Sequence, residues 1–259
     1  MVKATPSAAL ILKEIRASLD SRSDGRGDKA KGIAPKSPLR TLGVRPSLLR
    51  SIARDIQGKT RPSIEYPTAL ALVDAAVARK VREEILVALD VLEHHQKEFA
   101  PGLFAKVEKW SAVADDLEVA EVLGTRVAAP ALRIEPAKLN VVKKWAKLRS
   151  VGKRHLAVLA ATGLVMDGHR DAAAVLNLAE MLLDEQSPLM VSAVARLLRE
   201  TTRVDAKAVQ DFLFRRSIDG NPEILRAGSE NLDAARRAAL IAKLEAQAAL
   251  MIPLAAAER

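Results

Sequence analysis

The sequence predicts an all-α protein, and three observations carry this prediction. Alanine and leucine are abundant while aromatic residues make up only 3% of the chain, a mix that suits helices packed through small and straight-chain side chains. Apolar residues recur at helical spacing nearly everywhere after residue 46, and alternating strand-like runs are absent. The apparent helix starts repeat at a nearly constant interval. Together these features predict a HEAT-like repeat α-solenoid, with about six helix pairs in a right-handed superhelical arc.

The interval is about 35 residues and occurs in two interleaved series. One series places proline or aspartate, which suit the first turn of a helix, at Pro67, Pro101, Pro136, Asp171 and Asp205. The other series runs through Leu48, Glu83, Glu118, Lys153, Pro188 and Pro222. Two series with one period mean that a pair of helices is repeated, each pair burying its apolar face on its neighbours. An irregular helical bundle remains the alternative, because the repeats share little sequence.

Segments outside the repeats differ in composition. Residues 1–20 predict an N-terminal helix that begins near residue 6. Residues 21–40 are rich in glycine, serine, proline and basic side chains, so we expect a mobile basic loop. The repeat domain then spans residues 41–250 and ends in a capping helix over about 231–250. Residues 251–259 are expected to form a tail that frays.

Charge and composition narrow the class of protein. A net charge of +9 and a pI near 9.9 favour a polyanionic partner, nucleic acid above all, although many soluble proteins are basic without one. With no cysteine, disulfide scaffolds and cysteine zinc sites are excluded. Neither a membrane-length apolar run nor a signal-peptide layout is present, so we expect a cytoplasmic, nucleoid-associated protein. His94 and Glu98 lack further ligands nearby, and no cofactor or metal is expected.

Basic side chains occur on several of the second helices of the pairs. Because a repeat returns each helix to a similar position, these cations are expected to form a stripe that neutralises successive DNA phosphates. The alternative is that each cation is solvated or forms a salt bridge within the array. The candidate DNA-binding residues of this stripe are Arg50, Arg54, Lys153, Arg154, Arg196 and Arg199.

Four segments together resemble the DNA alkylation repair (AlkD-like) glycosylase family, in that family's order and at similar separations. They are GVRPSLLRSIARDI, EILVALDVLEHHQKEF, KKWAKLRSVGKRHLAVLAA and VARLLRETTRVDAKAVQDFL, within residues 40–230. The more specific points are the Gly43-Val44-Arg45 start, the Leu198-Arg199-Glu200 run and the helix of Trp145. The resemblance implies a HEAT-like fold, in agreement with the repeat, and adds Arg45 to the candidate DNA-binding residues.

The resemblance also implies an activity. Members of the family typically remove N3- or N7-alkylated purines from double-stranded DNA, without the flipped-base pocket of most glycosylases. Aromatic faces and a carboxylate contact the sugar of the lesion, where an oxocarbenium cation develops as the glycosidic bond breaks. The expected partner is therefore duplex DNA that is alkylated or distorted, bound by a monomer.

The family's catalytic motif reads roughly Trp-Asp-x-x-Asp, and its best register here is Leu117-Glu118-Val119-Ala120-Glu121, in the stretch KWSAVADDLEVAEVLG. Glu121 then stands at the catalytic position and Glu118 contacts substrate. A shift by one residue would place Ala120 there instead, and the acids would then be an ordinary solvated face. Trp110 is either a second substrate contact or a core residue.

The motif departs from the family in ways that leave the activity open. Lys153-Arg154 replaces a pair of arginines, and Arg154 keeps the forked geometry that clamps a phosphate. Arg196 replaces a tryptophan, which removes an aromatic surface. Two further hypotheses therefore stand beside the glycosylase: a catalytically silent protein that recognises distorted or branched DNA, and a helical scaffold for an acidic protein partner.

Overall fold

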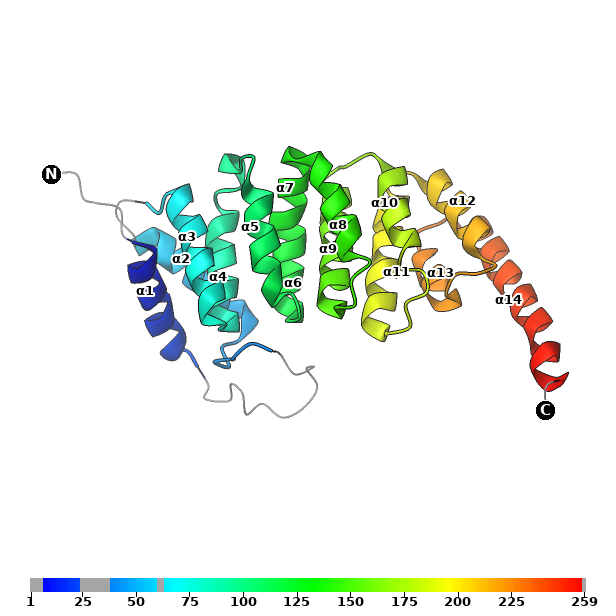
Figure 1. Ribbon diagram of the computed structural model, residues 1–259, viewed down its shortest axis with the longest axis horizontal. Coiled ribbons are helices and arrows are strands. Elements are labelled where there is room, and N and C mark those ends of the chain that lie inside the picture. Colours follow the sequence, from blue (N-terminus) through cyan, green and yellow to red (C-terminus); the bar gives the residue numbers. More distant parts are fainter. Residues whose placement is uncertain (1–6, 24–37, 60–62, 258–259) are drawn as a thin grey trace. The chain divides into compact units, whose positions relative to one another are not determined.

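The computed structural model describes residues 7–23, 38–59 and 63–257, and Figure 1 shows its helices. Within these residues there is no β-strand, only an isolated bridge between Arg40 and Val81. The predicted all-α class is confirmed. The chain divides into two compact units, one ending at Lys138 and the other beginning at Leu139.

The first unit contains three successive helix pairs within its described residues, with short 3₁₀ turns between helices (Figure 1, blue to green). The second helix of the third pair runs without a break through α6, the π-helix η3 and α7. Its elements are α1 (Ala8–Asp20), α2 (Pro46–Lys59), α3 (Tyr66–Arg79), α4 (Arg82–Glu93), η1 (Gln96–Glu98), α5 (Leu103–Trp110), η2 (Ser111–Val113), α6 (Leu117–Val122), η3 (Leu123–Ala128), α7 (Ala129–Ile134) and η4 (Pro136–Lys138).

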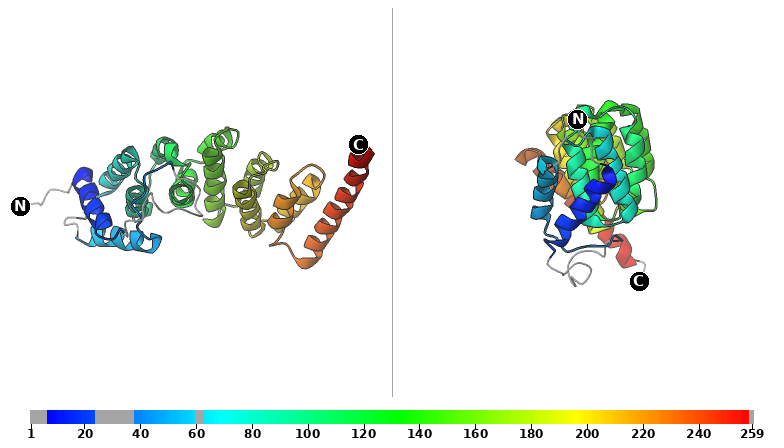
Figure 2. Two further views of the ribbon diagram at one scale, coloured as in Figure 1. Left: turned by 90° about the horizontal axis from the view of Figure 1, so that it is seen from below. Right: turned by 90° about the vertical axis from the view of Figure 1, so that its left-hand side faces the viewer.

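Three more pairs and a long final helix make up the described residues of the second unit, and Figure 2 shows the same ribbons from two further sides. The elements are α8 (Leu139–Trp145), α9 (Val151–Met166), α10 (Ala172–Glu180), α11 (Pro188–Thr202), α12 (Ala206–Arg216), α13 (Pro222–Gly228) and α14 (Ala234–Ala257).

The helices begin close to the positions that the repeat predicts, because the capping chemistry repeats too. Asp171 and Asp205 are N-caps whose carboxylates accept the backbone N–H groups of Ala174 (3.0 Å) and Ala208 (2.9 Å). Pro188 and Pro222 each occupy the first residue of a helix, where the missing N–H costs nothing. Pro101 and Pro136 lie just before their α-helices, the second of them opening the 3₁₀ turn η4.

Each unit is held together by contacts between equivalent helices of neighbouring pairs. In the first unit α2 packs on α4 and α4 on α6, while α1 packs on α3. In the second unit α11 lies between α9 and α13, and α10 packs on α12. This stacking of second helix on second helix is the repeat packing that the 35-residue interval predicts, with about that separation in sequence.

The chain ends differ in part from expectation. The predicted N-terminal helix is α1, capped by Ser7, and it buries Ile11, Leu12, Ile15 and Leu19 against the first unit. It is therefore part of the stack. The final helix α14 continues to Ala257, into the predicted tail. Most of the predicted basic loop, residues 24–37, lies outside the described residues. In the part of the chain that is described, every helix is too short or too polar to span a bilayer.

Candidate functional site

The acidic stretch at residues 115–121 divides into structural and accessible carboxylates. Asp116 is only 1% exposed, caps α6 by accepting the Val119 N–H (3.1 Å), and pairs with Arg82 through a 2.6 Å contact. The cap and the ion pair give this residue a structural role. Asp115 is exposed and precedes the helix.

Trp110 is a core residue. Its side chain is 1% exposed, and its indole Nε1 donates a 2.8 Å hydrogen bond to Asp74. Asp74 in turn pairs with Lys106, so the tryptophan joins α5 to α3. Of the two interpretations of Trp110, its burial and its hydrogen bond to Asp74 favour the core residue over the substrate contact.

Glu118 and Glu121 line a hollow of about 390 Å³ between α2, α4 and α6. Both acids come from α6, while Leu49 and Leu86 supply aliphatic wall from α2 and α4. Ala120 is fully buried. The register that places Glu121 at the reactive position therefore has an accessible carboxylate, whereas the shifted register would place a buried methyl group there.

The same hollow is closed by Arg126, which lies on the π-helix η3 that continues α6. Its Nη1 reaches Asp90 (3.2 Å) and Glu93 (3.0 Å), both on α4. Asp90 is 8% exposed. Burial raises the pKa of the Asp90 carboxyl, and the positive charge of Arg126 offsets only part of that rise.

A second hollow, of about 680 Å³, adjoins the first, since Arg50, Asp90 and Arg126 line both. It adds Arg54 from α2 and His94 from the end of α4. His94 Nδ1 is 2.8 Å from the Asp90 carbonyl oxygen. The candidate residue Arg50 thus stands where an acidic, apolar hollow meets a hollow with a mostly basic rim.

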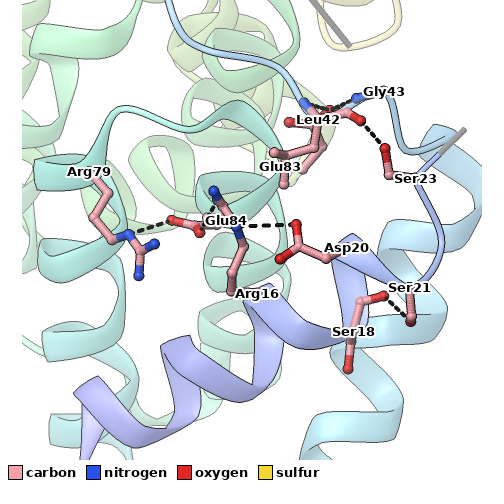
Figure 3. A network of polar contacts seen from close by, with 10 residues as sticks. All are labelled: Arg16, Ser18, Asp20, Ser21, Ser23, Leu42, Gly43, Arg79, Glu83 and Glu84. Carbon is pink, nitrogen blue, oxygen red and sulfur yellow. Dashed lines mark hydrogen bonds and ion pairs between the residues drawn. The ribbon is translucent and has the colours of Figure 1, made fainter. Parts of the chain in front are cut away.

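A buried network places the start of α2 beside this site (Figure 3). One carboxylate oxygen of Glu83 accepts the backbone N–H groups of Leu42 and Gly43, each at 2.9 Å. Gly43 has a φ of 75°, in the region that favours glycine, so the chain turns here into Arg45 and α2. Arg45 itself is exposed.

Glu84 anchors the same network to α1 and α3 (Figure 3). It is fully buried and pairs with Arg16 (2.6 Å) and Arg79 (3.1 Å). Two guanidinium groups on one buried carboxylate offset its desolvation. The N-terminal helix is therefore fastened to the element, α4, that carries Asp90.

In the second unit, the candidates Lys153 and Arg154 lie in the first turn of α9. Lys153 Nζ stands 5.5 Å from the ring centroid of Trp145, a cation–π contact with α8. Arg154 forms an ion pair with Glu185 and donates to the carbonyl oxygens of Leu148 (2.9 Å) and Arg149 (2.8 Å). Its guanidinium is occupied within the protein.

Arg196 and Arg199 lie on α11 and have partners as well. Arg196 Nη2 is 3.9 Å from the sulfur of Met166. Arg199 donates to the Ala227 carbonyl oxygen (3.1 Å) and pairs with Glu230 (3.3 Å), which ties α11 to the region of α13. The alternative of salt bridges within the array is thus realised for Arg154 and Arg199.

The structure brings Glu118, Glu121 and Arg50 to one hollow, and it adds two residues that sequence reasoning missed. The sequence offered a sign of the buried Asp90, because this residue is the lone acid in the apolar run ILVALDVL. Arg126 had none, because its partners Asp90 and Glu93 lie 36 and 33 positions away in the sequence. Among the described residues, no group of three or more histidines, aspartates and glutamates is arranged to hold a metal ion.

Comparisons with known proteins complete the description. The model of a protein family described as "DNA alkylation repair enzyme" matches residues 16–232. A solved structure titled "Predicted DNA alkylation repair enzyme from Enterococcus faecalis" superposes with a TM-score of 0.59 at 11% sequence identity, covering 89% of this chain and 99% of that one. At such an identity the likeness establishes the fold alone. No curated protein matches the chain.

Proposed function

Since the chain belongs to the family of DNA alkylation repair enzymes, we propose that it binds duplex DNA and excises N3- or N7-alkylated purines as a DNA N-glycosylase. The observation that carries this proposal is the position of Glu118 and Glu121, on one side of a hollow shared by the second helices of three successive pairs. A monomer suffices, because the whole hollow belongs to one unit of one chain.

The excision reaction requires few groups from the protein. Alkylation leaves a positive charge on the purine, so the base departs neutral when the bond from its nitrogen to C1′ of the sugar breaks. The sugar becomes an oxocarbenium cation, and a carboxylate beside it stabilises that charge. Water then adds to C1′ and loses a proton. Glu121 is the residue we assign to stabilise the cation and position the water, with Glu118 next to it.

Backbone binding falls to basic residues of both units. Arg45 and Arg50 are exposed at α2, and Lys153 stands at the start of α9. Arg154, Arg196 and Arg199 contact phosphates only by exchanging protein partners for DNA, which lowers what each contributes to affinity. The exposed cations of α2 therefore contribute most to affinity in this proposal.

Release of 7-methylguanine and 3-methyladenine from methylated duplex DNA, in a single-turnover assay, tests the enzymatic part. Glu121→Gln removes the charge but keeps the size, and we expect the rate to fall about a hundredfold. Glu14→Gln, on the exposed face of α1, is the charge-matched control and should release base at the wild-type rate. An undiminished rate in Glu121→Gln would remove that residue from the mechanism.

The second candidate function is binding without excision, and one observation favours it. Leu117 lines the hollow where the family motif carries tryptophan, so the aromatic surface next to the lesion is missing. A protein of this kind retains distorted or branched DNA through backbone and shape, with salt-sensitive affinity. Retention without base release supports this candidate, and absence of retention supports the scaffold for an acidic protein.

A further inference from the structure

The turn that joins α8 to α9 in the second unit combines exposed aliphatic side chains with a high density of positive charge (Figure 1). The basic segment around it, residues 143–154 (KKWAKLRSVGKR), contains six basic residues and no acidic one. Within this segment Leu148 is 44% exposed and Val151 is 41% exposed. Single exposed aliphatic side chains are ordinary on protein surfaces. Here two of them stand three residues apart, with cations before, between and after them.

The other two turns within helix pairs of the second unit have a different composition. Residues 181–187 (MLLDEQS) include two acids, and residues 217–221 (SIDGN) include one. Ile218, in the last of these turns, is 62% exposed. Because equivalent turns connect the same two helices of each repeat, the repeat itself does not require the acid-free, basic composition of residues 143–154.

The positive charge of the basic segment is not cancelled within the protein. Lys147 and Arg149 are exposed, and neither forms an ion pair in the part of the chain that the structure describes. The acid that contacts this turn, Glu185, is already neutralised by Arg154. The tip of the turn therefore presents two cations on either side of the exposed Leu148 side chain.

Arg154 holds the tip of the turn in place. Its Nη1 donates hydrogen bonds to the carbonyl oxygens of Leu148 (2.9 Å) and Arg149 (2.8 Å), while its Nε and Nη2 hold Glu185 of the next helix pair. Ser150 caps α9 by accepting the Lys153 N–H at 3.2 Å. A turn whose backbone is fixed in this way loses little conformational entropy when it binds a partner.

The minor groove of duplex DNA matches this arrangement. Proteins that bend DNA insert an aliphatic side chain such as leucine between two base pairs from the minor groove, while cations neutralise the phosphates on either side. An anionic bilayer matches less well, because even a whole fatty-acyl chain gives only marginal membrane binding and two partly exposed side chains bury less apolar surface.

We propose that the basic segment is a DNA wedge. Leu148 enters the minor groove and separates one base step, Lys147 and Arg149 contact the flanking phosphates, and Arg154 is the positioning residue that holds the turn. The choice of duplex DNA rests on the proposed function. A wedge kinks the duplex without needing a pocket for the base, in keeping with the pocket-free mode that the family resemblance implies.

Two duplexes of the same sequence, one of them with a central mismatch, test the wedge. Both are unmethylated and carry a donor and an acceptor dye at their ends, so that the full-length protein is tested without any excision. Unstacking costs less at a mismatch, and we expect the mismatched duplex to bind about tenfold more tightly. Energy transfer between the dyes should rise on binding, because a kink brings the two ends closer.

Substitutions at exposed positions separate the wedge from the phosphate contacts. Leu148→Ser should lose the mismatch preference and the rise in energy transfer, but keep the salt slope of binding. Ile218→Ser, at the exposed aliphatic residue of the equivalent turn, is the matched control and should change neither. Lys147→Gln combined with Arg149→Gln should weaken binding of both duplexes equally and make the salt slope shallower by about 2.

Arg154→Lys tests the positioning role. Lysine keeps the charge but lacks the fork that holds two carbonyl oxygens and Glu185 together. We expect a smaller mismatch preference and a smaller rise in energy transfer at an unchanged salt slope. A shallower slope with the preference intact would make Arg154 a phosphate ligand and not a positioning residue. The thermal unfolding midpoint of each variant checks that the fold is retained.

The outcomes distinguish the wedge from the proposed function. A mismatch preference that is absent from wild type, or that survives Leu148→Ser, overturns the wedge even if the protein releases alkylated bases. A preference that depends on Leu148, without any base release, upholds the wedge and overturns the glycosylase. Failure to bind either duplex overturns both. Binding to phosphatidylserine vesicles that Leu148→Ser abolishes, with DNA binding unchanged, would assign this surface to a membrane and overturn the wedge.

Discussion

Asp90 is the residue at which burial and charge oppose each other most directly. It is 8% exposed, on the buried stripe of α4, and its carboxylate is held by Arg126 at 3.2 Å. Desolvation disfavours the ionised form, whereas the guanidinium favours it, and desolvation is the larger of the two effects. Its pKa is therefore raised, and the residue carries its charge at a cost to stability.

This balance gives the folding free energy a defined pH dependence. Because the pKa of Asp90 is higher in the folded than in the unfolded protein, the stabilisation it brings is complete at low pH and disappears as pH rises through the folded pKa. Asp90→Asn cannot ionise, and Glu93 still holds Arg126. We expect this variant to unfold at higher urea concentration than wild type near neutral pH, and the difference to shrink in acid.

Urea midpoints of wild type and Asp90→Asn, measured at about pH 7.5 and about pH 4.5, test whether ionised Asp90 lowers the stability of the fold. Asp184→Asn, at an exposed aspartate, is the control for a surface substitution and should differ little from wild type at either pH. A lower midpoint for Asp90→Asn at both pH values would mean that the ion pair with Arg126 outweighs burial.

The start of helix α6 carries one acid with a structural role, Asp116, and two acids that line the candidate site, Glu118 and Glu121. Asp116 is used as cap and ion-pair partner, which fixes where the helix begins. The π-helix η3 then widens the following turns, and Thr125 donates to the Glu121 carbonyl oxygen at 2.6 Å. Such bulges occur often at functional sites, because they reorient side chains that a regular helix would point elsewhere. Arg126, which pairs with Asp90 and Glu93 on α4, lies on this π-helix.

The close approach of α11 and α13 leads to a prediction about packing between helices. A Cβ atom at Gly228, on α13, would lie 2.7 Å from Leu198 Cδ1 and 3.1 Å from Leu198 Cβ, on α11. Leu198 is fully buried and has little room to move. Gly228→Ala is therefore expected to lower the free energy of unfolding by about 1–3 kcal/mol, measured by denaturant titration.

Gly58 is the matched control for that substitution. It lies on α2, and no atom of the described residues stands within 4 Å of where its Cβ would be. Gly58→Ala should stabilise the protein by up to about 1 kcal/mol through helix propensity alone. The packing argument fails if the two alanine variants change stability in the same direction.

For the molecule as a whole, a net charge of +9 predicts affinity for polyanions, but the structure divides the cations into two groups. Arg16, Arg82, Arg154 and Arg199 are engaged by carboxylates of the protein. Arg50 forms no ion pair within the described residues and stands at the candidate site. Net charge therefore overstates the number of cations free to meet phosphates.

The salt dependence of DNA binding measures how many cations of the protein contact DNA phosphates. The slope of log K against log salt changes by about 0.9 for each DNA phosphate that the protein neutralises. Arg50→Gln is expected to make the slope shallower by about 1, measured with unmethylated duplex DNA. Lys13→Gln, an exposed cation on α1 that lines neither hollow, should leave the slope unchanged. Equal slopes for both variants would place the DNA-binding surface elsewhere.

Local chemistry accounts for the part of the molecule that could be derived from residues alone. Helical periodicity, the prolines and aspartates at helix starts and the 35-residue interval depend on neighbours close in the chain, so the all-α class and the positions of most helices followed from them. Glu121 came instead from the resemblance to the family's motif, and its catalytic role stays a proposal.

The composition of the site depended instead on side chains brought together from α2, α4 and α6. Packing between helices about 35 residues apart decides whether Trp110 is buried, which acids pair with a cation and where Arg126 lies. The π-helix that carries Arg126 has no periodic signature in the sequence. Hydrophobic pattern assigns a face to each helix, but the partner of a charge on that face is set by the neighbouring helix, and that required the folded structure.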